Sequence, residues 1–147
     1  MEIDLDNFSR AETIFQDSVM KNPNIELWTV YLNYVRRRHN LNVDSTGQAR
    51  KTVDQTFEVV LNAVGSDKDA GPLWREYLEF VKSAPGNVSG SGWQDQQKMD
   101  SVRKAYQRAV CVPNQETTAI WRQYHQFEMD LNKATVSSAS ESAHRLR

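Results

Sequence analysis

The chain has 147 residues, of which 39% are apolar and 25% charged, so it is long enough for one folded domain and ordinary in composition. Its formal net charge of −1 gives no long-range field that would favour binding to a nucleic acid or a membrane surface. The single cysteine excludes an internal disulfide framework and fits a reducing compartment. The acidic start, Met1–Asp6, does not resemble a signal peptide, and no window holds the roughly eighteen apolar residues of a membrane span.

The first two predicted helices are separated by a proline. Ser9 and Glu12 form a capping-box pattern for a helix that ends at Asn22–Pro23, because proline cannot continue a helix. Asn24 is then a candidate N-cap for the next helix. The apolar residues of this second helix are Leu27, Trp28, Tyr31, Leu32, Tyr34 and Val35. Their spacing predicts an amphipathic helix with an aromatic face.

Three consecutive arginines, Arg36–Arg38, follow that face. They fit a basic last turn that complements the negative end of the helix dipole. They also fit a contact point for RNA or for an acidic partner. The first interpretation is favoured, because no exposed aromatic residues are interleaved with the arginines as RNA binding would require.

The middle of the chain predicts two more helices and one flexible loop. Residues 49–65 have helical spacing of apolar side chains and end at Gly65, and Gly71–Val81 begins with Pro72 in its first turn. The stretch Ala84–Gly92 is rich in Gly and Ser, which predicts a mobile spacer rather than a partner-binding insertion.

The last third of the chain predicts two further helices and a tail. Met99–Val110 has the next apolar stripe and is closed by Pro113, and Ala119–Leu131 is the last strongly amphipathic stretch. Serines dominate residues 134–147, so we expect a frayed or disordered tail there.

One residue pattern, typical of a helix, recurs along the chain. Trp-x-x-Tyr-x-x-aromatic occurs at Trp28, Trp74 and Trp121, at intervals of about 46 and 47 residues, which is typical of a helical repeat array. The helices between these copies carry small residues that leave room for the large aromatic side chains. We therefore predict an all-α fold, an α-α superhelix of about six main helices in antiparallel pairs. The predicted repeat core consists of Trp28, Tyr31, Tyr34, Phe57, Trp74, Tyr77, Phe80, Ala105, Tyr106, Ala109, Trp121, Tyr124 and Phe127.

The predicted ends of the helices divide residues 1–133 into repeat units. The array is expected to consist of a half-repeat at 8–23, full repeats at 24–65 and 71–113, and a half-repeat at 116–132. Trp121, Tyr124 and Phe127 have no strong helix after them, so this end of the array should expose apolar surface that favours association.

The sequence carries no enzyme signature. It has no glycine-rich phosphate loop, no His-x-x-x-His, no Cys-x-x-Cys and no Gly-x-Ser-x-Gly, and we predict neither a cofactor nor a metal. His39, His125 and His144 are scattered, and Cys111 is expected to be a buried or half-buried structural thiol. Glu76 and Glu79 could suggest paired carboxylates, but the favoured interpretation is that they face solvent or pair with Arg75 and Lys82.

The alternation of aromatic-rich and small-residue helices resembles the half-a-tetratricopeptide (HAT) repeat. Glu128 beside Phe127 fits the motif, whereas Glu79 lies on the wrong side of Phe80 and Val60 stands where alanine is expected. Four features together are similar to the amino-terminal HAT half of the suppressor-of-forked family. The array opens on a lone helix of the small-residue type, and it contains the segments Pro-Asn-Ile-Glu-Leu-Trp, Gly-Pro-Leu-Trp-Arg-Glu-Tyr and Trp-Arg-Gln-Tyr-His-Gln-Phe-Glu. This family includes the large scaffold subunit of the cleavage stimulation factor, called cleavage factor IA in fungi. The resemblance covers roughly residues 5–133.

The resemblance implies a non-enzymatic nuclear scaffold in pre-mRNA 3′-end cleavage and polyadenylation, with other protein subunits as partners, indirect contact with RNA and no membrane. The family's homodimerisation region lies later and should be absent here. Residues 134–147 do not resemble the family's continuation, so the chain is expected to be a fragment, a truncated product or an altered splice form. Two alternatives stay open: a HAT component of a splicing or other RNA-processing complex, and direct RNA binding through a basic face. That face would consist of Arg36, Arg37, Arg38, Arg50, Lys51, Arg103, Lys104 and Arg108.

Overall fold

The computed structural model describes residues 24–43, 46–88 and 90–145, together with isolated helical positions between 10 and 21; for 134–145 it describes the backbone alone. The described residues contain helices and no strand, which confirms the predicted all-α fold. The chain divides into two compact units, Met1–Ala70 and Gly71–Arg147. The capping box at Ser9 and Glu12, and most of the half-repeat at 8–23, lie outside the described residues.

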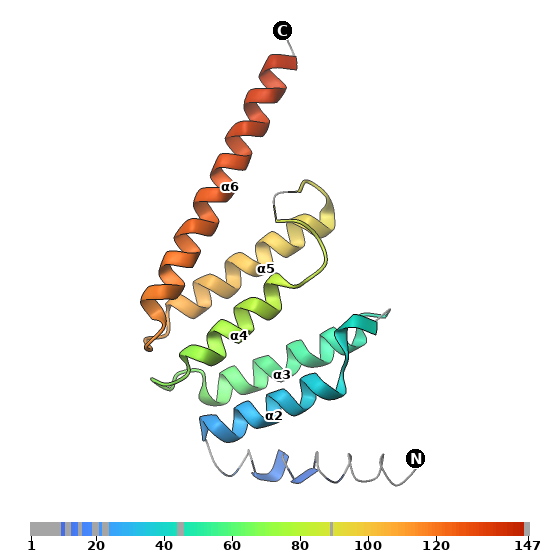
Figure 1. The fold of residues 1–147 in the computed structure, drawn as a ribbon, viewed down its shortest axis with the longest axis vertical. Helices are drawn as coiled ribbons and strands as arrows, with labels where there is room; N and C mark the ends of the chain where they lie inside the picture. Colours follow the sequence, from blue (N-terminus) through green and yellow to red (C-terminus); the bar gives the residue numbers. More distant parts are fainter. Residues whose placement is uncertain are drawn as a thin grey trace. The chain divides into compact units, whose positions relative to one another are not determined.

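The first unit contains a pair of antiparallel helices, α2 (Ile25–Arg38) and α3 (Gln48–Val64), with a short 3-10 helix, η1 (Leu41–Val43), after α2 (Figure 1). The side chain of Asn24 caps α2 as predicted, because its Oδ1 accepts a hydrogen bond from the Glu26 N–H at 2.9 Å. The two helices pack on each other. Their buried side chains are Trp28, Leu32 and Val35 from α2, and Val53, Thr56, Phe57, Val60, Leu61 and Val64 from α3.

The second unit contains three helices: α4 (Gly71–Lys82), α5 (Trp93–Val110) and α6 (Thr117–Arg145). Helix α5 packs on both α4 and α6 (Figure 1). The buried side chains of α4 include Leu73, Trp74, Tyr77, Leu78, Phe80 and Val81, and those of α5 are Val102, Ala105, Tyr106 and Ala109. Among the described side chains of α6, Ile120 is buried. Large aromatics on α4 thus meet a helix whose buried face includes two alanines, the arrangement that the sequence predicted.

The recurring Trp-x-x-Tyr motif has the same ring-packing geometry in its first two copies. The ring centroids of Trp28 and Tyr31 lie 6.3 Å apart with an interplanar angle of 81°, and those of Trp74 and Tyr77 lie 6.1 Å apart at 77°. Both pairs are edge-to-face contacts, which aromatic rings favour. The sequence repeat is therefore a repeat of side-chain packing as well.

The third copy of the motif, which begins at Trp121, departs from this pattern. Trp121 was predicted as core, and this is wrong: its side chain is 51% exposed, while Ile120 is fully buried. The preceding residue faces α5 because α6 presents Ile120, Tyr124 and Phe127 on one side, at helical spacings of four and three. Tyr124 and Phe127 are half-buried and their rings lie 5.6 and 5.5 Å from that of Tyr106. Tyr31 and Tyr34 of the first copy are also only half-buried.

The glycine-rich stretch before α5 is held in place, contrary to the expected mobile spacer. The Asp95 carboxylate accepts hydrogen bonds from the backbone N–H groups of Asn87 (2.7 Å) and Gly92 (3.2 Å), and Lys98 Nζ donates to the Gly86 carbonyl (3.1 Å). Gly90 approaches so closely that a Cβ there would lie 2.1 Å from Asp95 Oδ2. The glycines therefore let this loop fold back on the first turn of α5.

The serine-rich tail also differs from expectation. Helix α6 continues through residues 134–145 to Arg145, where we expected a frayed or disordered segment (Figure 1). Helical spacing in this segment is compatible with the continuation, because serine and alanine do not break a helix.

Replacing Trp74 with alanine should destabilise the chain by about 3–5 kcal/mol, because it removes a large side chain that is 2% exposed. The measurement is urea unfolding followed by circular dichroism. Trp121→Ala is the matched control, since it removes the same group from a half-exposed site and should cost less than about 1 kcal/mol. Equal losses from the two substitutions would show that the buried stripe is not the core.

Replacing Asp95 with alanine should release the loop at 84–92 and cost about 1–2 kcal/mol, because two backbone N–H groups lose their acceptor. Limited proteolysis measures the release as faster cleavage between Ala84 and Gly92. Asp100→Ala, at an exposed position of the same helix, serves as the control. Unchanged cleavage in Asp95→Ala would contradict the assignment of this carboxylate as the residue that fixes the loop.

Candidate functional site

Residues that could support catalysis do not come together in the part of the chain that the structure describes. No group of three or more His, Cys, Asp or Glu side chains there could hold a metal ion. His125 is exposed, and the side chain of His144 is not among those described. Cys111 was expected to be buried or half-buried, but it is exposed because it follows the last residue of α5, outside the packed face. None of the described helices combines the length and apolarity needed to cross a membrane.

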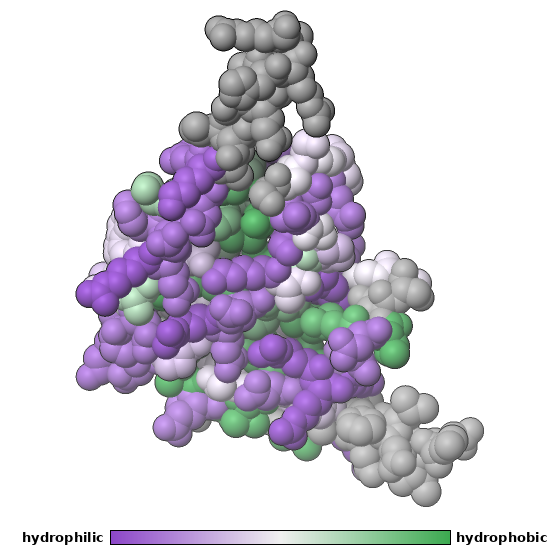
Figure 2. All heavy atoms as spheres, turned by 45° about the horizontal axis from the view of Figure 1, so that its top comes forward, coloured by the Kyte–Doolittle hydropathy of each residue, from purple (hydrophilic) through white to green (hydrophobic). Residues whose placement is uncertain are grey.

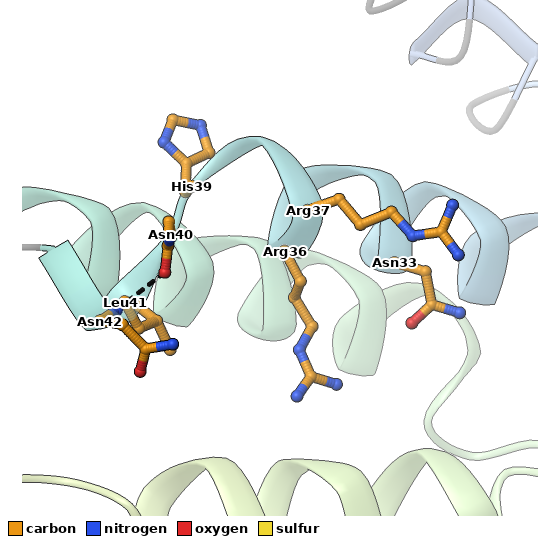
Figure 3. A pocket seen from close by; sticks show the side chains of 7 residues that line it. All are labelled: Asn33, Arg36, Arg37, His39, Asn40, Leu41 and Asn42. Atoms are coloured by element: carbon orange, nitrogen blue, oxygen red, sulfur yellow. Dashed lines mark hydrogen bonds between the residues drawn. The ribbon is translucent and has the colours of Figure 1, made fainter.

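A polar depression of about 630 Å³ lies at the carboxyl end of α2 (Figure 3). It is lined by the last turns of α2 and by the segment that leads into η1. The lining residues are Asn33, Arg36, Arg37, His39, Asn40, Leu41 and Asn42. Two of the three arginines singled out in the sequence therefore line a hollow rather than a flat surface, and the neighbouring amides were not predicted.

Helix geometry and a local turn shape this depression. Asn33 precedes Arg36 and Arg37 by three and four residues, the spacings that place helical side chains on one side. Beyond α2, Asn40 Oδ1 accepts a hydrogen bond from the Asn42 N–H at 2.9 Å, which turns the chain into η1 (Figure 3). Asn40 and Asn42 are recognisable in the sequence as residues that form turns. The sequence does not show that they line a depression, because this depends on the geometry of the loop.

Arg36 is braced by the core beneath it. Its guanidinium carbon lies 5.8 Å from the centroid of the Phe57 ring, within the range of a cation–π contact. Phe57 is fully buried and Arg36 is exposed, so the guanidinium group of Arg36 lies at the solvent-facing edge of the core, over the Phe57 ring.

The charges at this helix end favour an anion. The carboxyl end of a helix carries about half of a negative charge, which alone would repel one. Arg36 and Arg37 in the lining, with Arg38 beside them, each carry a full positive charge. The depression is therefore lined by cationic side chains.

Two other arginines of the predicted basic face, Arg103 and Arg108, are engaged inside the second unit. Arg103 forms two hydrogen bonds with Glu128, Nε to Oε1 at 2.6 Å and a second at 3.1 Å, and the hydrogen bond with Glu128 raises the pKa of Arg103. The guanidinium of Arg108 lies 5.5 and 6.0 Å from the rings of Trp74 and Tyr77. Lys104 is exposed. Arg36–Arg38 lie in the first unit and Arg103–Lys104 in the second.

One of the other ion pairs is local in sequence and one joins distant residues. Lys82 pairs with Glu79 at 3.5 Å, as predicted. Arg75 was expected to pair with a glutamate of its own helix, but it pairs with Glu116 at 3.1 Å. Glu116 can approach this closely because Gly71 has no Cβ. A Cβ at this position would lie 2.5 Å from the Glu116 side chain.

Hydrophobic side chains reach the surface only in limited areas. On the face drawn in Figure 2 hydrophilic side chains predominate, and hydrophobic ones form smaller patches between them. The exposed large apolar side chains among the described residues include Val43 and Trp93, both 77% exposed, and Trp121 and Met129 on α6. Of the residues for which the sequence predicted exposed apolar surface at this end of the array, Trp121 is exposed, whereas Tyr124 and Phe127 are half-buried.

Paired antiparallel helices with a recurring aromatic stripe define the class of helical-repeat proteins. Residues 1–145 match the family model described as Suppressor of forked protein (Suf), and the chain belongs to this family.

Named relatives share much of this sequence. The chain is 57% identical over 135 residues to the mRNA 3′-end-processing protein rna-14 of Neurospora crassa, and this alignment covers 92% of the chain and 12% of that protein. It is 54% identical to rna14 of Emericella nidulans, over 92% of the chain and 13% of that protein. It is 40% identical to rna14 of Schizosaccharomyces pombe, over 92% of the chain and 18% of that protein. The chain thus spans less than a fifth of the length of these relatives.

The Arg103–Glu128 pair should contribute about 0.5–1 kcal/mol to stability, because it is bidentate but more than a quarter exposed. A double-mutant cycle with Arg103→Gln and Glu128→Gln, measured by urea unfolding, gives the coupling energy. The coupling should fall as salt is raised. A coupling of zero at low salt would show that the pair does not hold α5 and α6 together.

Proposed function

We propose that this chain is a protein–protein interaction scaffold in pre-mRNA 3′-end cleavage and polyadenylation. The observation that carries the proposal is the family match over residues 1–145, with relatives named as mRNA 3′-end-processing proteins. The repeat architecture supports a scaffold rather than an enzyme, because helical arrays offer extended surfaces to partners. The proposal places the chain in the nucleus, with other protein subunits of the processing machinery as its partners.

Contact with RNA is indirect in this proposal. Arg103 is hydrogen-bonded to Glu128, and the guanidinium of Arg108 lies over the aromatic rings of α4, so both cations are engaged within their own unit. Continuous tracks of cations and exposed aromatics are what single-stranded RNA binding requires. The family match favours 3′-end processing over the splicing alternative.

The direct test is a chimera. The matching segment of the Neurospora crassa relative is replaced by this chain, and cleavage and polyadenylation of a reporter pre-mRNA are measured in extract. The chimera should support processing, whereas a protein lacking the segment should not. A chimera carrying Trp74→Ala should fail as well, because its second unit is destabilised. Processing that proceeds equally well without the segment would refute the proposed role.

RNA binding by the isolated chain is measured separately with a labelled single-stranded homopolymer across a salt series. We expect no binding at about physiological salt. Micromolar affinity with a steep salt dependence would overturn the indirect role assigned to RNA.

A further inference from the structure

We propose that the depression at the carboxyl end of α2 binds an acidic peptide segment, rich in Asp and Glu, of a partner protein. This inference rests on the proposed scaffold function, since it names the chemistry of one partner contact. It is carried by the charged hollow lined by Asn33, Arg36, Arg37 and Asn42.

The lining groups suit a carboxylate within a peptide. A guanidinium offers two parallel N–H groups that match the two oxygens of a carboxylate. Figure 3 shows Arg36, Asn33 and Asn42 pointing to the same side of the α2 ribbon, while His39 points to the other side. An amide side chain both donates and accepts, so Asn33 and Asn42 can pair with the backbone of an extended peptide.

Part of this site is ordered before a ligand arrives. Arg36 rests on the buried Phe57 ring, and the Asn40–Asn42 hydrogen bond fixes the turn beside it. Binding therefore costs less side-chain and loop entropy than it would with unrestrained groups.

Charge and shape favour a peptide over RNA. Residues 1–70 carry eight Lys and Arg against eleven Asp and Glu, so cationic side chains are concentrated at the depression and do not form the extended basic track that a long polyanion follows. The hollow of about 630 Å³ has the size of a site for a few side chains. Its lining offers no Phe, Tyr or Trp on which a base could stack.

The test uses the 147-residue chain and a fluorescein-labelled peptide of Glu and Asp residues with a single central Leu, followed by fluorescence anisotropy. A peptide with Gln and Asn in place of the acids is the uncharged probe. The double variant R36Q/R37Q should bind the acidic peptide at least about tenfold more weakly. The control K21Q/K68Q removes the same charge from exposed positions of the same unit, outside the depression, and should stay within about twofold.

A single substitution separates binding from folding. Arg36 covers Phe57, so its replacement can loosen the first unit, whereas Arg37 is exposed in the last turn of α2. Arg37→Gln should weaken peptide binding without changing the urea midpoint. Unchanged binding by Arg37→Gln and the double variant, equal losses in K21Q/K68Q, equal binding of the uncharged probe, or tighter binding of poly(U) than of the peptide would each overturn the proposal.

Failure here and failure of the proposed function are distinguishable. A chimera that supports processing while the chain ignores the acidic peptide refutes only the chemistry assigned to the depression. A chain that binds the peptide through Arg36 and Arg37 while the chimera is dispensable for processing refutes only the proposed role.

Discussion

The interaction on which each unit depends is the mutual burial of the apolar faces of neighbouring helices. In the second unit Trp74, Tyr77 and Phe80 of α4 are buried beside α5, whose buried face includes Ala105 and Ala109. The first unit buries Trp28 of α2 against α3, with the same edge-to-face contact between Trp and Tyr. Neither helix of such a pair could hide its apolar face alone, so the pair, rather than the single helix, is the unit of stability.

This packing decides where function can reside. The aromatic rings that could have stacked on a base or a ligand pack between helices instead. Arg103 pairs with Glu128, and Arg108 lies over the Trp74 ring, so both contribute to helix packing as well. Among the described residues, the groups that a partner could contact include the charged hollow after α2 and the exposed Trp121 on α6. Partner recognition from helix ends and outward faces is the usual property of a repeat scaffold.

Periodicity predicted the fold well because it reports directly on burial. The cap at Asn24, the recurring aromatic stripe and the buried alanines of α5 all follow from residue spacing and size. What the sequence did not predict depends on contacts between distant residues. The Asp95 carboxylate fixes a glycine-rich loop, Arg75 pairs with Glu116, and the orientation of α6 exposes Trp121 in place of Ile120. The arginines at the end of α2 were recognised as a cluster, but the hollow around them is formed by Asn40 and Asn42 through a local turn.

The most direct test of the packing argument enlarges a small residue instead of removing a large one. Ala109→Leu adds apolar volume at a fully buried position of α5, and Ala63→Leu adds the same group at an exposed position of α3. If aromatic and small residues fit together as described, Ala109→Leu lowers the free energy of unfolding by about 1–3 kcal/mol in urea, whereas Ala63→Leu changes it by less than about 0.5 kcal/mol. An Ala109→Leu chain as stable as the parent would contradict this account of how the helices are held together.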